Sequence, residues 1–327
     1  MTTAKSDLQS RPGLLEASYK AILITLIQSI DGSLRYGEAI YHWLRKPPHA
    51  PNLVKTYACR PSLSVRVFYP QSWDQESPKN LPCLFNIHGG GFCLRGPEDD
   101  DVWNRAFADM HHVLVVELNY RKAPAHPFPT PLFDIQALIL ATYNDASLPI
   151  DRQRIAVSGF SAGGNLAMAV CQLPLVRETI KPAAVVPMIL CYPPSSRPVT
   201  HSPPNVFIMA AELDQLSHEA WRMACILARR AEPFQGQKVG QDAPSKAEGA
   251  LILDDERFAF EDVDDAGRRV RWLLVPDQVH GFDLIPERMH GNAASFQDAQ
   301  IKKKEFQRVM GEWLRENAWK QSNLDSA

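Results

Sequence analysis

The stretch Gly159-Phe160-Ser161-Ala162-Gly163-Gly164 decides the fold of this chain. Residues 154–158 before it are typical of a short buried strand, and residues 165–171 after it are typical of the start of a buried helix. A serine at a sharp strand-to-helix turn has a strained backbone, so the residues two before and two after it must lack side chains that would collide across the bend. Gly159 and Gly163 meet that requirement. A glycine-rich turn with an idle serine would have the same spacing, so other segments must decide the role of the serine.

The composition is that of a globular protein with a large core. The chain has 327 residues, of which 45% are hydrophobic and 22% charged. The net charge is -2, and the sequence shows no basic stripe. This argues against nucleic acid or an anionic membrane as partner and favours a small molecule. The six cysteines lack metal-ligand spacing, so we expect free thiols, no metal site and a reducing, cytoplasmic compartment.

Residues 1–50 are predicted to be helical and to end at Lys46-Pro47-Pro48. The apolar run 21–27 is too short to span a bilayer and has no cleavage site close behind it, so we expect neither a signal peptide nor stable membrane insertion. A helix on a membrane surface stays open as an alternative. Apolar residues at helical spacing favour an amphipathic helix that packs on the body of the protein. This helical region is a candidate lid. These residues are Leu15, Tyr19, Ile22, Leu23, Leu26 and Ile30.

Strands and helices alternate along residues 51–327, which predicts an α/β fold with a mostly parallel sheet covered by helices on both faces. A polar segment at about 232–269 interrupts this alternation. The expected strands are 64–69, 83–87, 113–118, 154–158, 184–190, 205–211 and 270–275. The expected helices are 102–110, 131–144, a helix from 165 onward, 217–231 and one near the end of the chain.

A glycine loop follows a predicted buried strand. The loop His88-Gly89-Gly90-Gly91-Phe92 lies at the carboxyl end of that strand, the edge where open α/β sheets place their sites. Without side chains in the way, backbone N–H groups can point into a cavity and stabilise an oxyanion. A phosphate-binding loop would have Lys and Ser or Thr after the glycines, but Phe92-Cys93-Leu94 is apolar. A flexible glycine turn is the alternative.

A serine nucleophile needs a base, normally a histidine oriented by a carboxylate. His280 follows the last predicted strand, on the same sheet edge as Ser161. Asp214 follows another predicted strand on that edge, with Glu212 as its close rival and Asp277 as a weaker candidate. The acids from 254 to 265 are typical of a solvated face. The other histidines considered lie before a strand, between prolines or at a helix start: His111, His112, His126 and His218.

Taken together, these segments resemble the hormone-sensitive-lipase-like family of α/β-hydrolase esterases. The resemblance covers about residues 80–318 in the right order. It implies Ser161 as nucleophile, His280 as base and Asp214 as the orienting acid. It also implies an α/β-hydrolase fold, a cap made by the N-terminal helices, and an oxyanion hole from the N–H groups of Gly90, Gly91 and Ala162. The motifs that carry it are the glycine loop 88–92, the turn 159–164, Asn119-Tyr120-Arg121-Lys122-Ala123-Pro124, His126-Pro127-Phe128-Pro129, Asp134, Asp214 and His280-Gly281-Phe282.

The chain departs from the family pattern in three places. Ala125 and Lys122 stand where the family usually has glutamate and leucine, and Phe160 precedes the serine where Asp or Thr is frequent. The segment between the expected acid and base exceeds the need of one helix, one strand and two short connections by about 35 residues. We therefore predict a catalytic domain over 51–327 with an insertion at about 232–269. The insertion is a solvated excursion, an added hairpin at the sheet edge or a second lid.

The sequence thus predicts a serine hydrolase that cleaves carboxylic esters of small to medium, largely apolar substrates without metal or cofactor. Cleavage of a lactone, thioester or formamide would use the same residues. A ligand-binding receptor on this fold would be expected to lack the base. We expect a cytoplasmic monomer or homodimer. By adjacency, the substrate pocket is predicted to include Cys93, Leu94, Phe160, Tyr192 and Phe282.

Overall fold

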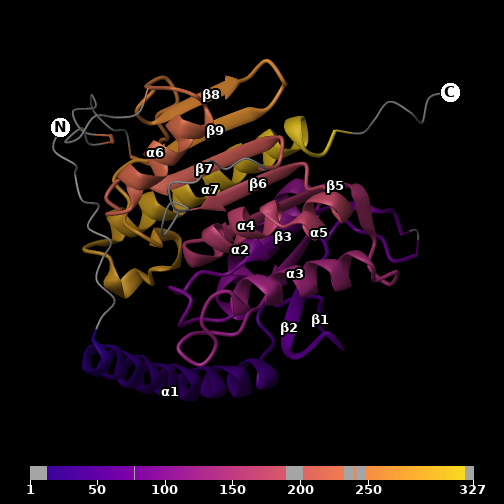
Figure 1. Ribbon diagram of the computed structural model, residues 1–327, viewed down its shortest axis with the longest axis vertical. Coiled ribbons are helices and arrows are strands. Elements are labelled where there is room, and N and C mark those ends of the chain that lie inside the picture. Colours follow the sequence, from indigo (N-terminus) through magenta and orange to yellow (C-terminus); the bar gives the residue numbers. More distant parts are fainter. Residues whose placement is uncertain (1–12, 77, 189–201, 232–238, 241–247, 321–327) are drawn as a thin grey trace.

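A nine-stranded sheet forms the centre of the protein (Figure 1). The computed structural model describes residues 13–76, 78–188, 202–231, 239–240 and 248–320. Across the described part, the strands follow one another in the order β1-β2-β4-β3-β5-β6-β7-β9-β8. They are β1 (Leu53–Tyr57), β2 (Arg60–Phe68), β3 (Leu81–Ile87), β4 (Leu114–Leu118), β5 (Ile150–Phe160), β6 (Ala184–Met188), β7 (Asn205–Ala211), β8 (Ala259–Val263) and β9 (Arg269–Val275).

The middle of the sheet is parallel, as the alternation of elements predicts. Strands β4, β3, β5, β6, β7 and β9 pair in parallel, whereas β1, β2 and β8 pair antiparallel at the two edges. Parallel neighbours end at the same edge, so the residues after β3, β5, β7 and β9 can meet there. The predicted α/β-hydrolase architecture with a mostly parallel sheet is confirmed.

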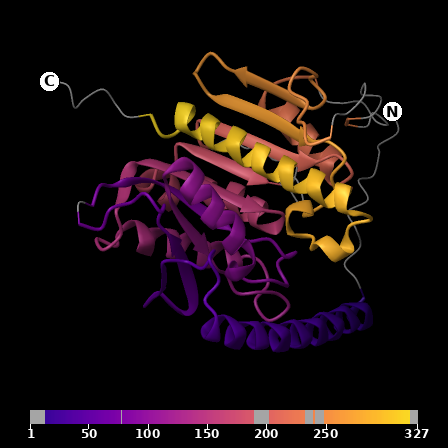
Figure 2. The same cartoon turned by 180° about the vertical axis from the view of Figure 1, so that it is seen from behind.

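Helices cover both faces of the sheet, as Figures 1 and 2 show from opposite sides. Helices α3, α4, α5 and α6 contribute buried residues to one apolar cluster, and α2 and α7 contribute to the other. The strands between them alternate: Leu114 and Val116 of β4 join the first cluster, whereas Val115 joins the second. The helices are α1 (Leu14–Leu44), α2 (Asp101–His111), α3 (Thr130–Tyr143), α4 (Ala162–Gln172), α5 (Pro174–Thr179), α6 (Ser217–Leu227) and α7 (Ala293–Asn317), with short 3₁₀ turns η1 (Pro97–Asp100), η2 (Phe282–Leu284) and η3 (Glu287–Met289).

The predicted N-terminal helix exists, but its apolar face does not pack on the body. The apolar side chains chosen from the sequence are exposed, from 43% at Leu23 to 89% at Leu15. The half-buried residues of α1 form a stripe on the opposite side of the helix, where hydrogen bonds and ion pairs attach it. No helix of the described part carries an apolar stretch long enough to cross a membrane. The half-buried stripe consists of Ala21, Ile24, Gln28, Asp31 and Arg35.

The described part of the insertion contains an edge hairpin, which is one of the three predicted alternatives. Strand β8 pairs with β9 through a turn in which the N–H of Gly267 donates to the carbonyl of Asp264. Phe260 of β8 is buried against the α6 side of the sheet, so the hairpin extends the core. The segments 232–238 and 241–247 lie outside the described residues. The alternative that these segments form a second lid therefore lies outside the described part as well.

Candidate active site

Ser161 stands at the turn between β5 and α4, with φ 50° and ψ −117°. A positive φ is costly for a residue with a side chain and is found where the surrounding structure imposes it. The prediction about the flanking glycines is confirmed. A Cβ atom at Gly159 would lie 2.4 Å from the carbonyl carbon of Gly163, and one at Gly163 would lie 2.0 Å from the carbonyl oxygen of Ile87. The tight packing of β3, β5 and α4 therefore holds the serine in its strained conformation.

Ser161, His280 and Asp214 form a continuous hydrogen-bonded chain. His280 Nε2 lies 3.0 Å from Ser161 Oγ, and His280 Nδ1 lies 2.7 Å from Asp214 Oδ2. Asp214 is buried, and its other oxygen accepts a 2.9 Å hydrogen bond from the N–H of Leu216. The three residues follow β5, β9 and β7, so the parallel sheet brings together side chains far apart in the sequence.

The acids that rival Asp214 have other positions. Glu212 Oε2 accepts a 2.8 Å hydrogen bond from the N–H of Asp277, and this bond joins the loops after β7 and β9. Asp277 itself is exposed, and its carboxylate lies 3.9 Å from Lys302 Nζ. Of the three carboxylates considered from the sequence, Asp214 is therefore the one hydrogen-bonded to His280.

The glycine loop lies beside Ser161 at the end of β3. Gly90 has φ +115°, a value that residues with side chains rarely adopt, and a Cβ there would lie 2.1 Å from the carbonyl oxygen of Leu94. The chain turns back at this point, because the N–H groups of Cys93 and Leu94 both donate to the Gly90 carbonyl. Ala162 opens α4, where the first N–H groups have no partner within the helix, and the Ser161 side chain does not cap them.

Three side chains of the sequence motifs support the glycine loop from below: His88, Tyr120 and Lys122. The ring of His88 stacks on Tyr120 at a centroid distance of 4.4 Å, and the Tyr120 hydroxyl lies 3.2 Å from the His88 carbonyl oxygen. Burial lowers the pKa of His88 to about 3, so its imidazole is neutral. Lys122 Nζ donates to the Tyr120 carbonyl, and burial lowers the pKa of this lysine to about 8. The neutral ring and the paired lysine form a rigid base under the loop.

Helix α1 is attached to the same loop by one side chain. Gln28 Nε2 donates to the carbonyl oxygens of Cys93 and Ala123, each at 2.7 Å. About two turns further along α1, Arg35 pairs with Glu98 and Asp99, both at 2.7 Å. These contacts connect α1 to the two loops that follow β3 and β4. The sequence offered no signal for them, because a glutamine on a helix is ordinarily solvated.

A cavity of about 170 Å³ opens above Ser161 and His280. Of the predicted pocket residues, Phe160 lines it. Phe282 is instead buried in the core, because the 3₁₀ turn η2 directs it towards α7. The centroid of its ring lies 6.1 Å from that of Phe306. Cys93 and Leu94 are not among the lining residues, since the chain reverses on Gly90 there, and Tyr192 lies outside the described residues. The lining residues are Gly89, Gly90, Gly91, Arg95, Phe160, Ser161, His280, Gly281, Asp283 and Leu284.

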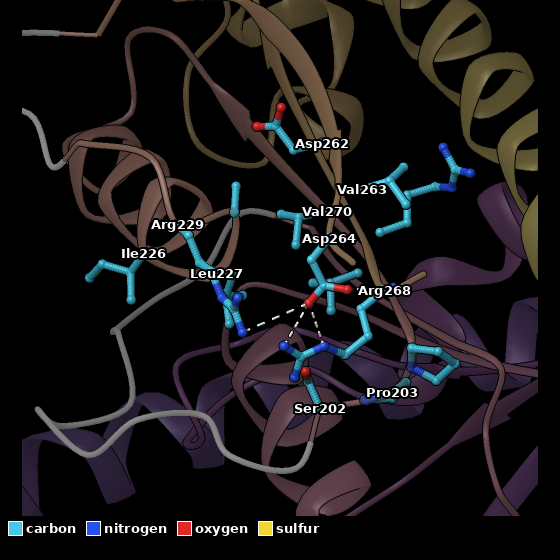
Figure 3. Close-up of a pocket in the computed structure, with 14 residues that line it drawn as sticks. Ser202, Pro203, Ile226, Leu227, Arg229, Asp262, Val263, Asp264, Arg268 and Val270 are labelled. Atoms are coloured by element: carbon cyan, nitrogen blue, oxygen red, sulfur yellow. Dashed lines mark hydrogen bonds and ion pairs between the residues drawn. The ribbon is translucent and has the colours of Figure 1, made fainter. Parts of the chain in front are cut away.

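A second cavity of about 270 Å³ lies at the opposite edge of the sheet (Figure 3). It is bounded by the first residues of β7 and β9 and by the end of α6. Two arginines at this cavity point towards Asp264. The Nη2 atoms of Arg229 and Arg268 lie 4.0 and 2.6 Å from Asp264 Oδ2. The amino ends of parallel strands are the edge away from Ser161, so this cavity is separate from the hydrogen-bonded chain.

Comparisons with known proteins agree with this geometry. A family model described as alpha/beta hydrolase fold matches residues 84–284. Carboxylesterase NlhH from Mycobacterium tuberculosis (strain CDC 1551 / Oshkosh) is 39% identical over 132 residues, which are 40% of this chain and 39% of that protein. Ethyl acetate hydrolase from Pseudomonas putida is 27% identical over 237 residues, 68% of this chain and 71% of that protein.

Among solved structures, esterase LipW from Mycobacterium marinum has the same fold. Its TM-score is 0.62 at 19% sequence identity, and the match covers 91% of this chain and 90% of that one. The chain spans only about two fifths of the length of NlhH. The matched family segment, in contrast, contains Ser161, Asp214 and His280 together with the glycine loop.

Proposed function

Because the chain belongs to the hormone-sensitive-lipase-like family of α/β-hydrolases, we propose that it hydrolyses carboxylic esters with Ser161 as nucleophile. The observation that most supports this proposal is the hydrogen-bonded chain from Asp214 through His280 to Ser161, with its distances of 2.7 and 3.0 Å. These are distances over which a proton can pass from the hydroxyl to the imidazole in a substrate complex.

The proposed reaction has two halves. Ser161 Oγ attacks the ester carbonyl carbon while His280 Nε2 takes the hydroxyl proton, and the carbonyl π electrons move onto oxygen to give a tetrahedral oxyanion. Collapse of this intermediate breaks the bond to the alcohol oxygen, which receives the proton from His280. Water then attacks the acyl-enzyme with His280 again as base, and the acid leaves as Ser161 regains its proton.

The backbone around the serine is suited to bind the oxyanion. Gly90 and Gly91 line the cavity beside Ser161, and Ala162 provides the first N–H of α4. We assign the oxyanion hole to these three N–H groups. Donors held in place by a rigid loop need no reorganisation during the reaction, and each contributes about 3 kcal/mol of barrier lowering. Asp214 is assigned to keep His280 oriented and to stabilise its charged form.

Hydrolysis of a panel of 4-nitrophenyl esters from acetate to decanoate tests the proposal. We expect turnover that is highest for short acyl chains, because a cavity of about 170 Å³ is smaller than the common range for ligand sites. Complete inertness with all esters would contradict ester hydrolysis. Parallel assays with a lactone, a thioester and a formamide distinguish the sibling reactions, which would use the same residues.

We further propose that α1 acts as a cap whose attachment keeps the glycine loop in place. Replacing Gln28 with Ala should lower kcat/KM for 4-nitrophenyl butyrate about tenfold, because Cys93 and Ala123 lose a shared hydrogen-bond donor and the loop is less well positioned. Thr25→Ala is the matched control, since the Thr25 hydroxyl donates to the Ala21 carbonyl within the same helix. Equal activity of the two variants would show that α1 is not coupled to the loop.

A further inference from the structure

Arg95 lines the cavity of Ser161 in an unfavourable backbone conformation. Its φ is +68°, in the left-handed region that favours glycine. The residue follows the glycine loop directly and lies with Ser161 and His280 around the same cavity. A long charged side chain in such a position costs about 1 kcal/mol or more of folding free energy, and positions of this kind cluster where a site needs the side chain.

The Arg95 guanidinium is only loosely held by the protein. Its Nε lies 3.3 Å from Asp99 and its Nη2 lies 3.2 Å from Asp100, both beyond the usual length of a charge-assisted hydrogen bond. Asp99 is at the same time bound more closely by Arg35, at 2.7 Å. A guanidinium has five N–H donors, and within the described residues three of those on Arg95 have no acceptor. The planar edge of the group is therefore available to a ligand.

Asp283 is a second polar group of this cavity and has no acceptor or donor for its carboxyl. The residue is only 5% exposed, yet within the described part neither carboxyl oxygen has a hydrogen-bond partner. Lys303 donates to the backbone carbonyl of Asp283 and not to its side chain. Burial raises the pKa of the Asp283 carboxyl above its ordinary value. A buried polar group without a partner costs about 1–3 kcal/mol, so Asp283 is a costly feature of the cavity wall that it shares with Arg95.

We propose that Arg95 provides a subsite for a free carboxylate on the substrate, so that the site prefers short esters carrying a second, ionised carboxyl group. This inference rests on the proposed ester hydrolysis at Ser161. The guanidinium fork matches the two oxygens of a carboxylate. The small cavity limits the distance between ester and carboxylate to a few bonds.

Monoethyl glutarate and ethyl pentanoate test this selectivity, because they differ only in the carboxylate that replaces a terminal methyl group. The ratio of their kcat/KM values, measured in a pH-stat, should exceed 1 in the wild type. It should fall about 10- to 100-fold in Arg95→Gly, the range for one lost hydrogen-bonded charge. Glycine relieves the strain of φ +68° but removes the partner of the buried Asp100, so the Tm of Arg95→Gly is measured to confirm that the variant is folded at the assay temperature. Arg66→Gln is the matched control, since Arg66 pairs with Asp101 away from the cavity.

The outcomes separate the subsite from the reaction. If the wild type hydrolyses ethyl pentanoate but the ratio changes less than twofold in Arg95→Gly, the subsite is refuted and ester hydrolysis stands. If neither ester is hydrolysed, the proposed reaction fails, and calorimetric titration of Ser161→Ala with monoethyl glutarate, with and without Arg95→Gly, decides about the subsite. Asp283→Asn should change the ratio less than threefold, because the Asp283 oxygens are buried and the substrate carboxylate binds to Arg95. A tenfold rise would mean that Asp283 is ionised and repels the carboxylate, which would contradict a carboxylate subsite in this cavity.

Discussion

Replacing Ser161 with Ala should reduce kcat for 4-nitrophenyl butyrate on the order of 10⁵-fold, the largest effect expected for any single change in this chain. The loss follows from the geometry: Ser161 Oγ is the atom that lies 3.0 Å from His280 Nε2 and beside the glycine loop. The measurement is steady-state hydrolysis with stopped assays long enough to detect 10⁻⁵ of the wild-type rate.

The fold should survive this change. Alanine keeps the Cβ atom of serine, and His280 is partly exposed, so its Nε2 can bond to water instead. Ser161→Gly provides a sharper control, because glycine should relieve the strain of φ 50° while the hydroxyl is equally absent. We expect Ser161→Gly to be as inactive as Ser161→Ala but more stable by about 1 kcal/mol, measured as a rise of about 2 °C in Tm.

A serine-reactive fluorophosphonate provides an independent readout. It should label the wild-type protein once, and tandem mass spectrometry should place the label on Ser161. Ser158, three residues earlier on β5, is fully buried and hydrogen-bonded to Asn86, so it should stay unlabelled. Labelling of Ser161→Ala to the wild-type extent, or hydrolysis by this variant above a hundredth of the wild-type rate, would remove Ser161 from the mechanism.

The parts of the fold that the sequence predicts well depend on local or strictly periodic signals. The apolar run 205–211 predicts a strand, and β7 extends from Asn205 to Ala211. The turn at Ser161 is likewise predicted correctly, because the steric requirement at Gly159 and Gly163 involves atoms of neighbouring residues and of one adjacent strand. Sheet topology then follows from the parallel alternation and brings Asp214 and His280 to the same edge.

What the sequence could not predict depends on which surfaces meet. Apolar spacing in α1 indicates an amphipathic helix, but its attachment to the body is made by Gln28 and Arg35 on the opposite face. Pocket residues inferred from adjacency in the sequence meet the same difficulty. Phe282 lies two residues after His280, yet η2 directs its ring into the core. Arg95 could be found only from its backbone angle and its position at the cavity, neither of which a residue pattern contains.

Asp214→Asn should lower kcat on the order of 10³- to 10⁴-fold, while KM changes less than threefold. The amide is nearly isosteric, and its oxygen can still accept from the N–H of Leu216. Its NH₂ group, however, would face His280 Nδ1, 2.7 Å away, and would favour the tautomer with the proton on Nε2. That tautomer cannot accept the proton of Ser161. The rate of fluorophosphonate labelling should fall in parallel with kcat, a change that a purely structural effect on substrate binding would not cause.

Glu212→Gln is the matched comparison, because the sequence leaves Glu212 as the rival acid and it lies on the same loop. The Glu212 carboxylate accepts from the N–H of Asp277, and a glutamine oxygen can accept that bond equally well. We therefore expect kcat of Glu212→Gln to stay within threefold of the wild type. If Glu212→Gln instead lost the activity and Asp214→Asn kept more than a tenth of it, the orienting role would pass to Glu212. Thermal unfolding of both variants distinguishes this result from a loss of folded protein. Replacement of the orienting acid should lower kcat strongly while Tm stays nearly unchanged.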